Sequence, residues 1–271
     1  MDRVTGQSFD ILRCCQCGLR YTSPRPPADE LAVYYPQPLD PPWLAQIVRR
    51  WLRRRRAQWS AAGQPPGRAL EIGCGDGWML NALRQAGWEV VGTERSEESA
   101  ARPRNLGLDV RVGNVDRCGF PAASFDLVIL WHALEHLDDP LATLIEARRI
   151  MCPTGRLVVA VPNADSWQAR VAGRRWVHLD VPRHLYHFGP ETLAATLERA
   201  GFSLETWSFS SLTYECRGWW DSPAACVGSS MLTYALAGLL LPFAVTLSTI
   251  AAYRKASAAM TVRARPTVGN A

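Results

Sequence analysis

Three glycines and two acidic residues lie close together in the stretch Leu70–Gly77, which reads L-E-I-G-C-G-D-G. Glycines stand at every second position from Gly73 to Gly77, and carboxylates stand before and inside this loop at Glu71 and Asp76. Glycine permits a sharp turn and lets a ligand come close to the backbone. Carboxylates at such a loop repel a pyrophosphate and favour a cation. The pattern therefore predicts a nucleoside cofactor with a positive charge, such as a sulfonium with an amino-acid tail.

The elements around this loop alternate between apolar strands and helices. Residues 68–72 predict a buried strand, and residues 78–86 predict the helix that follows it. Further strands are expected at 89–93, 109–112, 125–131, 156–161 and 202–209, with helices at 96–106, 141–151 and 192–200. This alternation predicts an α/β fold, a doubly wound parallel sheet with helices on both faces.

A glycine-rich turn between a strand and a helix also occurs in proteins that bind NAD or FAD. Their fingerprint is G-x-G-x-x-G, whose backbone amides hold a pyrophosphate, whereas the glycines here follow G-x-G-x-G. Glu94 ends the second strand, where its carboxylate can accept hydrogen bonds from two ribose hydroxyls. An NAD-dependent Rossmann oxidoreductase remains an alternative, as does a non-catalytic cofactor-binding module at a membrane.

The motifs that follow the loop are similar, in order and spacing, to those of a known family. E-x-G-C-G-x-G, the acid that ends the second strand, F-P-A-A-S-F-D at 120–126 and L-E-H-L-D-D-P at 134–140 resemble class I S-adenosylmethionine-dependent methyltransferases. P-R-H-L-Y-H-F at 182–188 resembles the bacterial group called methyltransferase domain type 23. The resemblance runs from about Gly67 to Phe209. It implies S-adenosylmethionine as cofactor, methyl transfer to an O, N or C nucleophile, and a Rossmann-like sheet of seven strands whose last strand is antiparallel.

The resemblance also implies roles for residues at the strand ends. Glu94 would bind the ribose, and Asn114 stands where the family usually has Asp, within reach of the adenine amino group. Trp131 and His132 would face the reaction centre at the end of the fourth strand. The expected cofactor-binding residues are Glu71, Gly73 and Gly75 along the methionine part, together with Cys74, Gly77, Glu94, Asn114, Val115 and Trp131.

Three histidines are the predicted catalytic residues: His132, His184 and His187. His132 opens the pattern H-x-x-E-H, an inverted zinc-protease motif. Because this pentapeptide follows a buried strand, where a loop is expected, we expect His136 to hold the turn and no metal to bind. His184 and His187 have two open readings: either accepts a proton from a hydroxyl or amine acceptor, or the segment latches a cap over the cofactor.

Residues 1–40, a leader rich in Cys, Pro and Tyr, are predicted to be irregular. R-Y-T-S-P-R-P at 20–26 resembles the leader of the same group, in which a C-x-x-C such as Cys14–Cys17 is the second half of a four-cysteine zinc ribbon. Two thiolates cannot fill a tetrahedral structural site. We expect a truncated, metal-free remnant, or an N-terminus that begins further upstream. The scattered cysteines and the lack of a secretory signal favour a reducing cytosol.

Residues 41–66 are expected to form a basic amphipathic helix, over 43–59, and a linker. One face carries apolar side chains and the other carries arginines: Leu44, Ile47, Val48, Trp51 and Leu52 against Arg49, Arg50 and Arg53–Arg56. Basic residues opposite Trp and Leu favour an anionic lipid surface. We expect no nucleic-acid partner, because the sequence offers no aromatic platform of the kind that binds RNA.

The stretch from Ser222 to Tyr253 has no charged residue. It is long enough for a transmembrane helix of about 20 residues. Residues 259–266 are expected to be the last strand of the sheet, so both ends of the stretch must lie on one side of any membrane. We therefore predict a monotopic helical hairpin or re-entrant element, the alternative being a helical cap on the protein itself or on a second copy. Basic residues beyond the stretch place both ends in the cytosol.

The chain of 271 residues is thus predicted to have five parts. They are the leader 1–40, the basic helix and linker 41–66, the cofactor-binding core 67–213, a hydrophobic helical insertion 214–256, and the last strand and tail 257–271. The predicted partners are a small-molecule or lipid-linked acceptor and the inner face of the cytoplasmic membrane, bound through 222–253 and 43–59. The membrane signals favour a lipophilic acceptor.

Overall fold

The computed structural model describes residues 5–27, 30–34, 43–209, 214–215, 217–218, 246 and 249–267. The chain divides into two compact units whose segments alternate along the sequence. Unit 1 comprises Met1–Pro36, Ala160–Ala195 and Trp207–Thr261, and unit 2 comprises Gln37–Val159, Thr196–Thr206 and Val262–Ala271.

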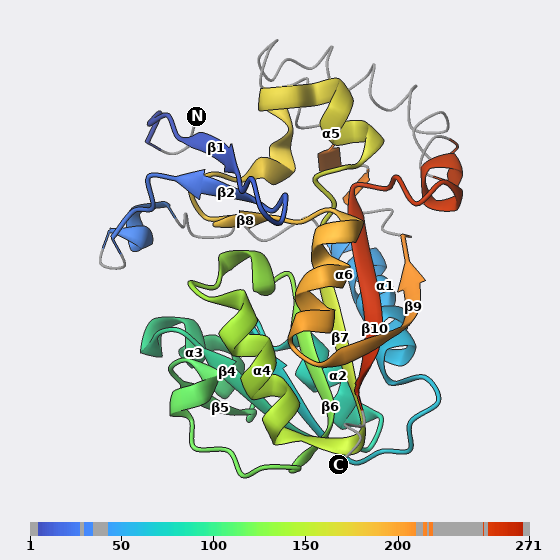
Figure 1. Ribbon diagram of the computed structural model, residues 1–271. Helices are drawn as coiled ribbons and strands as arrows, with labels where there is room; N and C mark the ends of the chain where they lie inside the picture. The colour runs from blue at the N-terminus through green and yellow to red at the C-terminus, as the bar shows by residue number, and fades with distance from the viewer. Residues whose placement is uncertain are drawn as a thin grey trace. The chain divides into compact units, whose positions relative to one another are not determined.

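A seven-stranded sheet has the strand order β5-β4-β3-β6-β7-β10-β9 (Figure 1). Its strands are β3 (Arg68–Ile72), β4 (Glu89–Glu94), β5 (Asp109–Val112), β6 (Phe125–Trp131), β7 (Met151–Pro162), β9 (Phe202–Ser208) and β10 (Ala259–Pro266). β3 pairs in parallel with β4 and β6, so that Glu71 lies opposite Gly92 and Ile129. The order reverses at β3, and the doubly wound sheet that the sequence predicts is confirmed.

The last strand, β10, runs antiparallel to β9. The backbone N–H of Thr267 donates to the carbonyl of Gly201 at 2.8 Å, and Ser203 Oγ donates to the carbonyl of Arg265 at 3.4 Å. Residue numbers therefore fall along one strand as they rise along the other. β10 lies between β7 and β9. The antiparallel last strand that the family resemblance implies is confirmed at residues 259–266.

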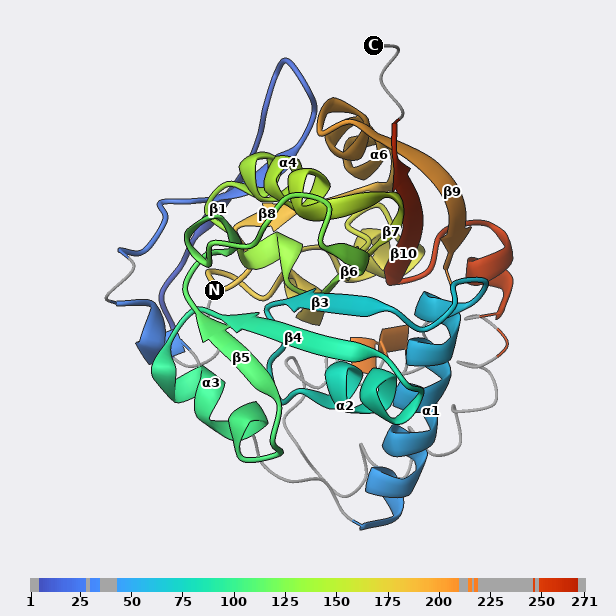
Figure 2. The ribbon, with the colours of Figure 1, turned by 90° about the horizontal axis from the view of Figure 1, so that it is seen from below.

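Six α-helices have their full bounds within the described residues: α1 (Trp43–Ala61), α2 (Trp78–Gln85), α3 (Glu97–Arg104), α4 (Pro140–Ile150), α5 (Trp167–Ala172) and α6 (Pro190–Arg199). Figure 2 shows α1 and α2 on one side of β3 and β4, and α4 on the other. α4 begins where the Asp139 side chain accepts a hydrogen bond from the Ala142 N–H at 2.9 Å, with Pro140 in its first turn. The fully buried Leu80 of α2 packs in one core cluster with Leu127 of β6.

Unit 1 contains a second, three-stranded sheet of β1 (Asp10–Arg13), β2 (Arg20–Ser23) and β8 (Tyr186–His187), in the order β1-β2-β8. The prediction that residues 1–40 are irregular is therefore wrong. β1 and β2 form an antiparallel hairpin, and Tyr21 of β2 pairs with Tyr186 of β8. The C-x-x-C sequence lies in the loop of this hairpin, where the Gly18 N–H donates to the Cys14 carbonyl at 3.0 Å. These strands were hidden because they are short and their partner is far away in sequence.

Most of the uncharged stretch 222–253, and with it the predicted hairpin, lies outside the described residues, which include only 246 and 249–253 of it. Among the residues that the structure describes, no helix is long and apolar enough to cross a membrane.

Candidate active site

The glycine loop turns sharply at the carboxyl end of β3. Gly73, Gly75 and Gly77 all have positive φ, at 71°, 55° and 72°, a region that side chains other than glycine rarely occupy. A Cβ atom at Gly73 would lie 2.9 Å from the Cβ of Ala133, so no side chain fits there. A Cβ atom at Gly75 would meet nothing within 4 Å. The backbone at Gly75 therefore borders open space in which a ligand can approach it.

Glu71 lies beneath this loop as a buried carboxylate, with only 2% of its surface exposed. Its Oε2 atom has no hydrogen-bond partner among the described residues. Burial raises the pKa of Glu71 well above its ordinary range, and the negative charges of Asp76 and Glu94 raise it further. The Leu80 N–H donates a hydrogen bond to this carboxyl group and the Arg53 charge attracts it, and both lower its pKa in part. The oxygen that lacks a partner is still costly to bury unless a cation or donor comes to it. Glu71 thus fits an ammonium group, and it disfavours a pyrophosphate.

Asp76, the second acid of the loop, is held by the protein itself. Arg53 Nη2 of α1 lies 2.8 Å from Asp76 Oδ2, and the same guanidinium lies over the Trp78 ring, 5.2 Å from its centroid. The negative charge of Asp76 is therefore compensated within unit 2. Of the two acids from which the sequence predicts a cation site, Glu71 is the one that remains available.

α1 is helical over the predicted range, but its arginines do not form one solvated face. Arg53 and Arg56 are partly buried, whereas Trp51, expected on the apolar face, is 55% exposed. The Arg56 guanidinium lies over the Trp131 ring at 5.7 Å. Arg53 and Arg56 thus contact aromatic rings and a carboxylate beside the loop. The predicted division of α1 into an apolar face and a basic face is therefore wrong for these side chains and for Trp51.

Glu94 joins the loop to the end of the neighbouring strand. Its Oε1 accepts a hydrogen bond from the Gly75 N–H at 2.5 Å, so the carboxylate lies against the loop. The Gly113 N–H donates to the Glu94 carbonyl at 2.8 Å, which brings the end of β5 beside β4. The next two residues follow there, Asn114 exposed and Val115 buried. Unit 2 thus gathers most of the predicted cofactor-binding residues along one edge of its strands.

Cys74 and Gly77, also in the predicted set, shape the inner side of the loop. Cys74 is buried, and a Cβ atom at Gly92 would lie 2.7 Å from its Sγ. Burial raises the pKa of the Cys74 thiol, which therefore stays protonated and serves packing. A Cβ atom at Gly77 would lie 2.6 Å from Leu108, so glycine is needed there for close packing.

Trp131 and His132 stand at the carboxyl end of β6. Trp131 meets Trp78 edge to face, with ring centroids 5.8 Å apart. His132 has a positive φ of 53°, an unusual conformation for a side chain of this size and one that often marks functional sites. Burial, with the charge of Arg56, lowers the pKa of His132 to about 3, so its imidazole is neutral at physiological pH.

His184 and His187 belong to unit 1, and both are buried. His187 Nε2 shares a hydrogen bond with Thr22 Oγ1 at 2.9 Å, and His184 Nδ1 hydrogen-bonds with the His178 carbonyl at 3.0 Å. Burial and Arg20 lower the pKa of His187 to about 4. These contacts tie the motif to β2 and to the turn at His178 within unit 1. Both readings of His184 and His187, the catalytic one and the latch, stay predictions.

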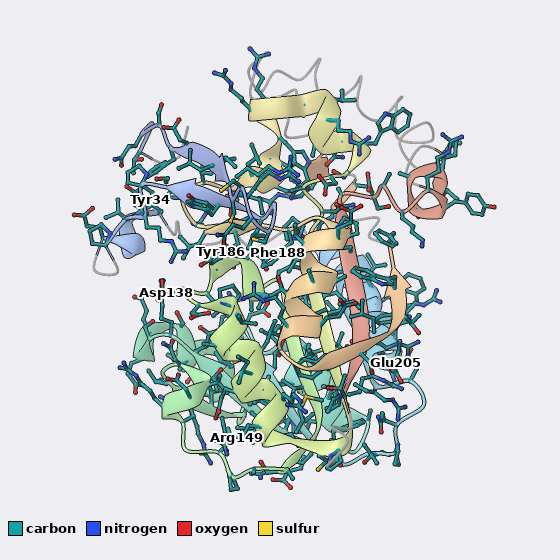
Figure 3. The ribbon with its side chains drawn as sticks, in the orientation of Figure 1. Tyr34, Asp138, Arg149, Tyr186, Phe188 and Glu205 are labelled. Carbon is teal, nitrogen blue, oxygen red and sulfur yellow. The ribbon has the colours of Figure 1, made fainter. Side chains whose placement is uncertain are left out.

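Tyr186, which directly precedes His187, has different neighbours. Figure 3 labels Tyr186 and Phe188, whose rings lie 6.2 Å apart. The Arg25 guanidinium lies over the Tyr186 ring at 4.9 Å and donates a hydrogen bond to its hydroxyl. The motif P-R-H-L-Y-H-F thus binds the N-terminal hairpin segment on two sides, through His187 and through Tyr186.

Three residues of the site were not among those predicted from the sequence. Arg53 and Arg56 approach the loop and the end of β6 from α1, and Trp78 follows the loop directly. The signal in the sequence is weak: two arginines three residues apart on the helix that precedes the glycine loop. Nothing in their spacing says which of the arginines of α1 point inward.

Comparisons with known proteins agree with this geometry. A family model described as a methyltransferase domain matches residues 44–206. A probable S-adenosylmethionine-dependent methyltransferase of Mycolicibacterium smegmatis is 31% identical over 162 residues, 57% of this chain and 60% of that protein. A ubiquinone biosynthesis O-methyltransferase of Xanthomonas axonopodis pv. citri is 31% identical over 170 residues, 58% of this chain and 70% of that protein.

A solved structure of a SAM-dependent methyltransferase from Archaeoglobus fulgidus has the same fold. The TM-score is 0.57 with 22% sequence identity, and the match covers 80% of this chain and 94% of that one. This chain thus matches nearly the whole of that structure, but only 60% of the length of the mycobacterial protein.

Proposed function

This chain belongs to the methyltransferase domain family, and on that premise we propose that it transfers a methyl group from S-adenosylmethionine to a lipophilic small-molecule acceptor. S-adenosylmethionine is the cofactor of the family, and when bound it supplies a methyl group on a positively charged sulfur. The observation that carries the proposal is the buried Glu71 carboxylate, whose Oε2 has no hydrogen-bond partner among the described residues. A cofactor with a cationic amino-acid tail suits that group.

The chain's own residues bind the three parts of this cofactor. Glu71 takes the ammonium group, and the backbone at Gly75 lets the cofactor approach closely. The Glu94 carboxylate accepts hydrogen bonds from the ribose hydroxyls. The Gly75 N–H already orients this carboxylate. Asn114 takes the adenine amino group through its exposed amide.

On the acceptor side, His132 acts as a neutral hydrogen-bonding group. With a pKa of about 3 it is a weak base at neutral pH, because an efficient general base has a pKa near the working pH. We therefore assign His132 to positioning the acceptor rather than to carrying its proton away. Arg56 supports this role, because its charge helps to keep the imidazole neutral.

A lipophilic acceptor is supported by two observations. Several relatives that are 26% to 31% identical are named ubiquinone biosynthesis O-methyltransferases, and a quinone precursor is lipophilic. The uncharged stretch from Ser222 to Tyr253 adds a segment suited to an apolar environment. We propose that the enzyme works in the cytoplasm on the inner face of the membrane, and that an oxygen is the atom methylated.

Calorimetry with S-adenosylmethionine and with NAD tests the cofactor assignment. We expect the chain to bind S-adenosylmethionine, and the Glu71→Gln variant to bind it much more weakly. Glu89→Gln is a matched control, because Glu89 is an exposed acid at the start of the adjoining strand. Binding of NAD without binding of S-adenosylmethionine would overturn the proposal.

Incubation with methyl-labelled S-adenosylmethionine and a cell extract tests the acceptor. The label should appear in the fraction soluble in organic solvent, on a product that mass spectrometry can identify. A label found only in water-soluble products contradicts a lipophilic acceptor and leaves the methyltransferase assignment intact.

A further inference from the structure

Two exposed segments of unit 1 meet at one place. The first is α5 with the turn that follows it, residues 167–175, and the second is the helical turn and bend at 249–255. The Trp167 N–H donates to the Ala256 carbonyl at 3.0 Å, and the Asn163 N–H donates to the Ala258 carbonyl at 2.8 Å. These bonds fix the start of α5 beside the end of the 249–255 segment (Figure 1).

Large apolar side chains on both segments are exposed. Trp167 is 45% exposed and Val171 64%, one helical turn apart on α5. On the other segment Ile250 is 44% exposed and Tyr253 92%. These four residues, with the exposed basic residues of the same two segments, form what we name the Trp167 surface. Grouped exposed apolar residues mark interaction sites, and Trp and Tyr are the side chains that favour a membrane interface.

The same two segments carry a strong positive charge. Their exposed basic residues are Arg170, Arg174, Arg175, Arg254 and Lys255. In the sequences 163–175 and 249–258 the one acidic residue is Asp165, and it forms an ion pair with Arg20. The Trp167 surface thus combines exposed apolar side chains with basic side chains and no unpaired acid, the combination that binds an anionic lipid surface.

A pocket of about 240 Å³ adjoins this surface. Arg174 lines it together with Arg20, while Trp176, Leu179 and other residues give it apolar walls. A guanidinium group beside an apolar wall suits a phosphate that carries a hydrocarbon chain. The pocket therefore offers a place for a phospholipid headgroup at the edge of the Trp167 surface.

We propose that the Trp167 surface docks on an anionic lipid bilayer. A second copy of the chain is a poorer occupant, because a two-fold contact would set the five cations of one copy against those of the other. The apolar side chains enter the interfacial layer, and the arginines and the lysine lie against lipid phosphates. The proposal rests on the proposed function in one respect, that the acceptor is lipophilic and lies in the membrane. Lipid binding itself can be measured without methyl transfer.

Co-sedimentation of the full chain with vesicles tests this surface. We expect binding to vesicles that contain phosphatidylglycerol, little binding to pure phosphatidylcholine, and weakening by salt. The double variants Trp167→Ser/Tyr253→Ser and Arg174→Glu/Arg175→Glu should each bind at least about tenfold more weakly. Matched controls are Ile145→Ser, a 51% exposed apolar residue on α4, and Arg117→Glu, both in unit 2 and both expected to bind as the parent does.

Hydrogen exchange on the unaltered chain gives a second reading that does not depend on how variants fold. Vesicles with phosphatidylglycerol should slow exchange at 167–175 and 249–255. Three results would overturn the proposal: no vesicle binding by the parent chain, equal binding by the double variants and the controls, or protection of the two segments that follows protein concentration and not lipid. If the parent chain binds S-adenosylmethionine but no vesicles, the docking proposal fails and the proposed cofactor assignment stands.

Discussion

Two regions of the molecule bury titratable groups, and they treat those groups in opposite ways. In unit 2, Glu71 lies beneath the glycine loop with an oxygen that has no hydrogen-bond partner among the described residues. In unit 1, the buried His187 shares a hydrogen bond with Thr22, and the buried His184 bonds to the His178 carbonyl. A buried polar group without a partner destabilises the fold by about 1–3 kcal/mol. The protein tolerates that cost at Glu71 and avoids it at the two histidines.

This difference distinguishes a ligand-binding site from a structural joint, by which we mean a contact that holds two segments of the chain together. A group kept for a ligand must stay unsatisfied until the ligand arrives, whereas a group that holds two segments together is satisfied inside the protein. We therefore predict that Glu71 binds a ligand and that His187 holds β2 and β8 together. Four experiments would sharpen or break this comparison.

The largest effect is expected for Glu71→Gln. The neutral amide cannot ionise, so the affinity for S-adenosylmethionine should fall about 10- to 100-fold, as expected for the loss of a charge-assisted hydrogen bond. Above the pKa of Glu71, the variant without cofactor should also be more stable than the parent chain, because it no longer buries a charge. Calorimetry gives the affinity and thermal unfolding the stability. Because the pKa of Glu71 is raised, cofactor binding should also strengthen as the pH rises through that pKa and should release a proton. An unchanged affinity would break the comparison.

The next largest loss of cofactor affinity is expected for Gly75→Ala. Alanine at a φ of 55° adds strain of about 1–2 kcal/mol, and its Cβ atom enters the space that borders the loop. We expect S-adenosylmethionine to bind about tenfold more weakly or worse. Gly119→Ala is a close control, because Gly119 has a φ of 66° and its Cβ atom would also meet nothing within 4 Å. Equal loss of affinity in both variants would show that strain alone acts.

The sequence predicted the region around Glu71 well and the region around His187 poorly. Strands β3 and β6 were predicted to the residue, because each is a mostly buried and mainly apolar run. β5 was also predicted to the residue, from the alternating sequence D-V-R-V. β1 and β2 each have only four residues, and their pairing with β8 depends on contacts such as Thr22 with His187. No local pattern records a partner so far along the chain.

Within the site, residue types were easier to predict than contacts. Glu71 and Glu94 followed from acids at the ends of two predicted strands. That Arg53 compensates Asp76 could not be read from the sequence, since it depends on how α1 lies against the loop. The neutral state of His132 could not be read either, because it arises from burial and from Arg56.

A third experiment probes His187 through the pH dependence of stability. Unfolded, this histidine titrates near 6.5; folded, its pKa is about 4. Between these values the unfolded chain binds the proton and the folded chain does not, so stability falls as the pH falls, by at most about 1.4 kcal/mol per pH unit. Denaturant unfolding at pH 6.5 and pH 5 should show a smaller loss for His187→Gln than for the parent chain.

The same variant tests the catalytic prediction for this histidine. If His187 serves only the joint, His187→Gln and Thr22→Val should lower the stability and leave the affinity for S-adenosylmethionine unchanged. A large fall in kcat with unchanged stability would instead place His187 in catalysis and break the contrast between the two regions.

The smallest effect is expected for Arg53→Gln. Arg53 touches the loop through Asp76 and Trp78, and both of its contacts are partly solvated, so the pair is worth only about 0.5–1 kcal/mol. Its loss leaves a second negative charge beside Glu71, which raises the pKa of Glu71 further. We expect the affinity for S-adenosylmethionine to fall a few-fold at neutral pH and to recover at higher pH, where Glu71 ionises again. Arg53→Lys should restore the affinity, because it keeps the charge. A loss that Arg53→Lys does not rescue and pH does not alter would mean that Arg53 acts by packing against Trp78, and Asp76 would then have no electrostatic link to Glu71.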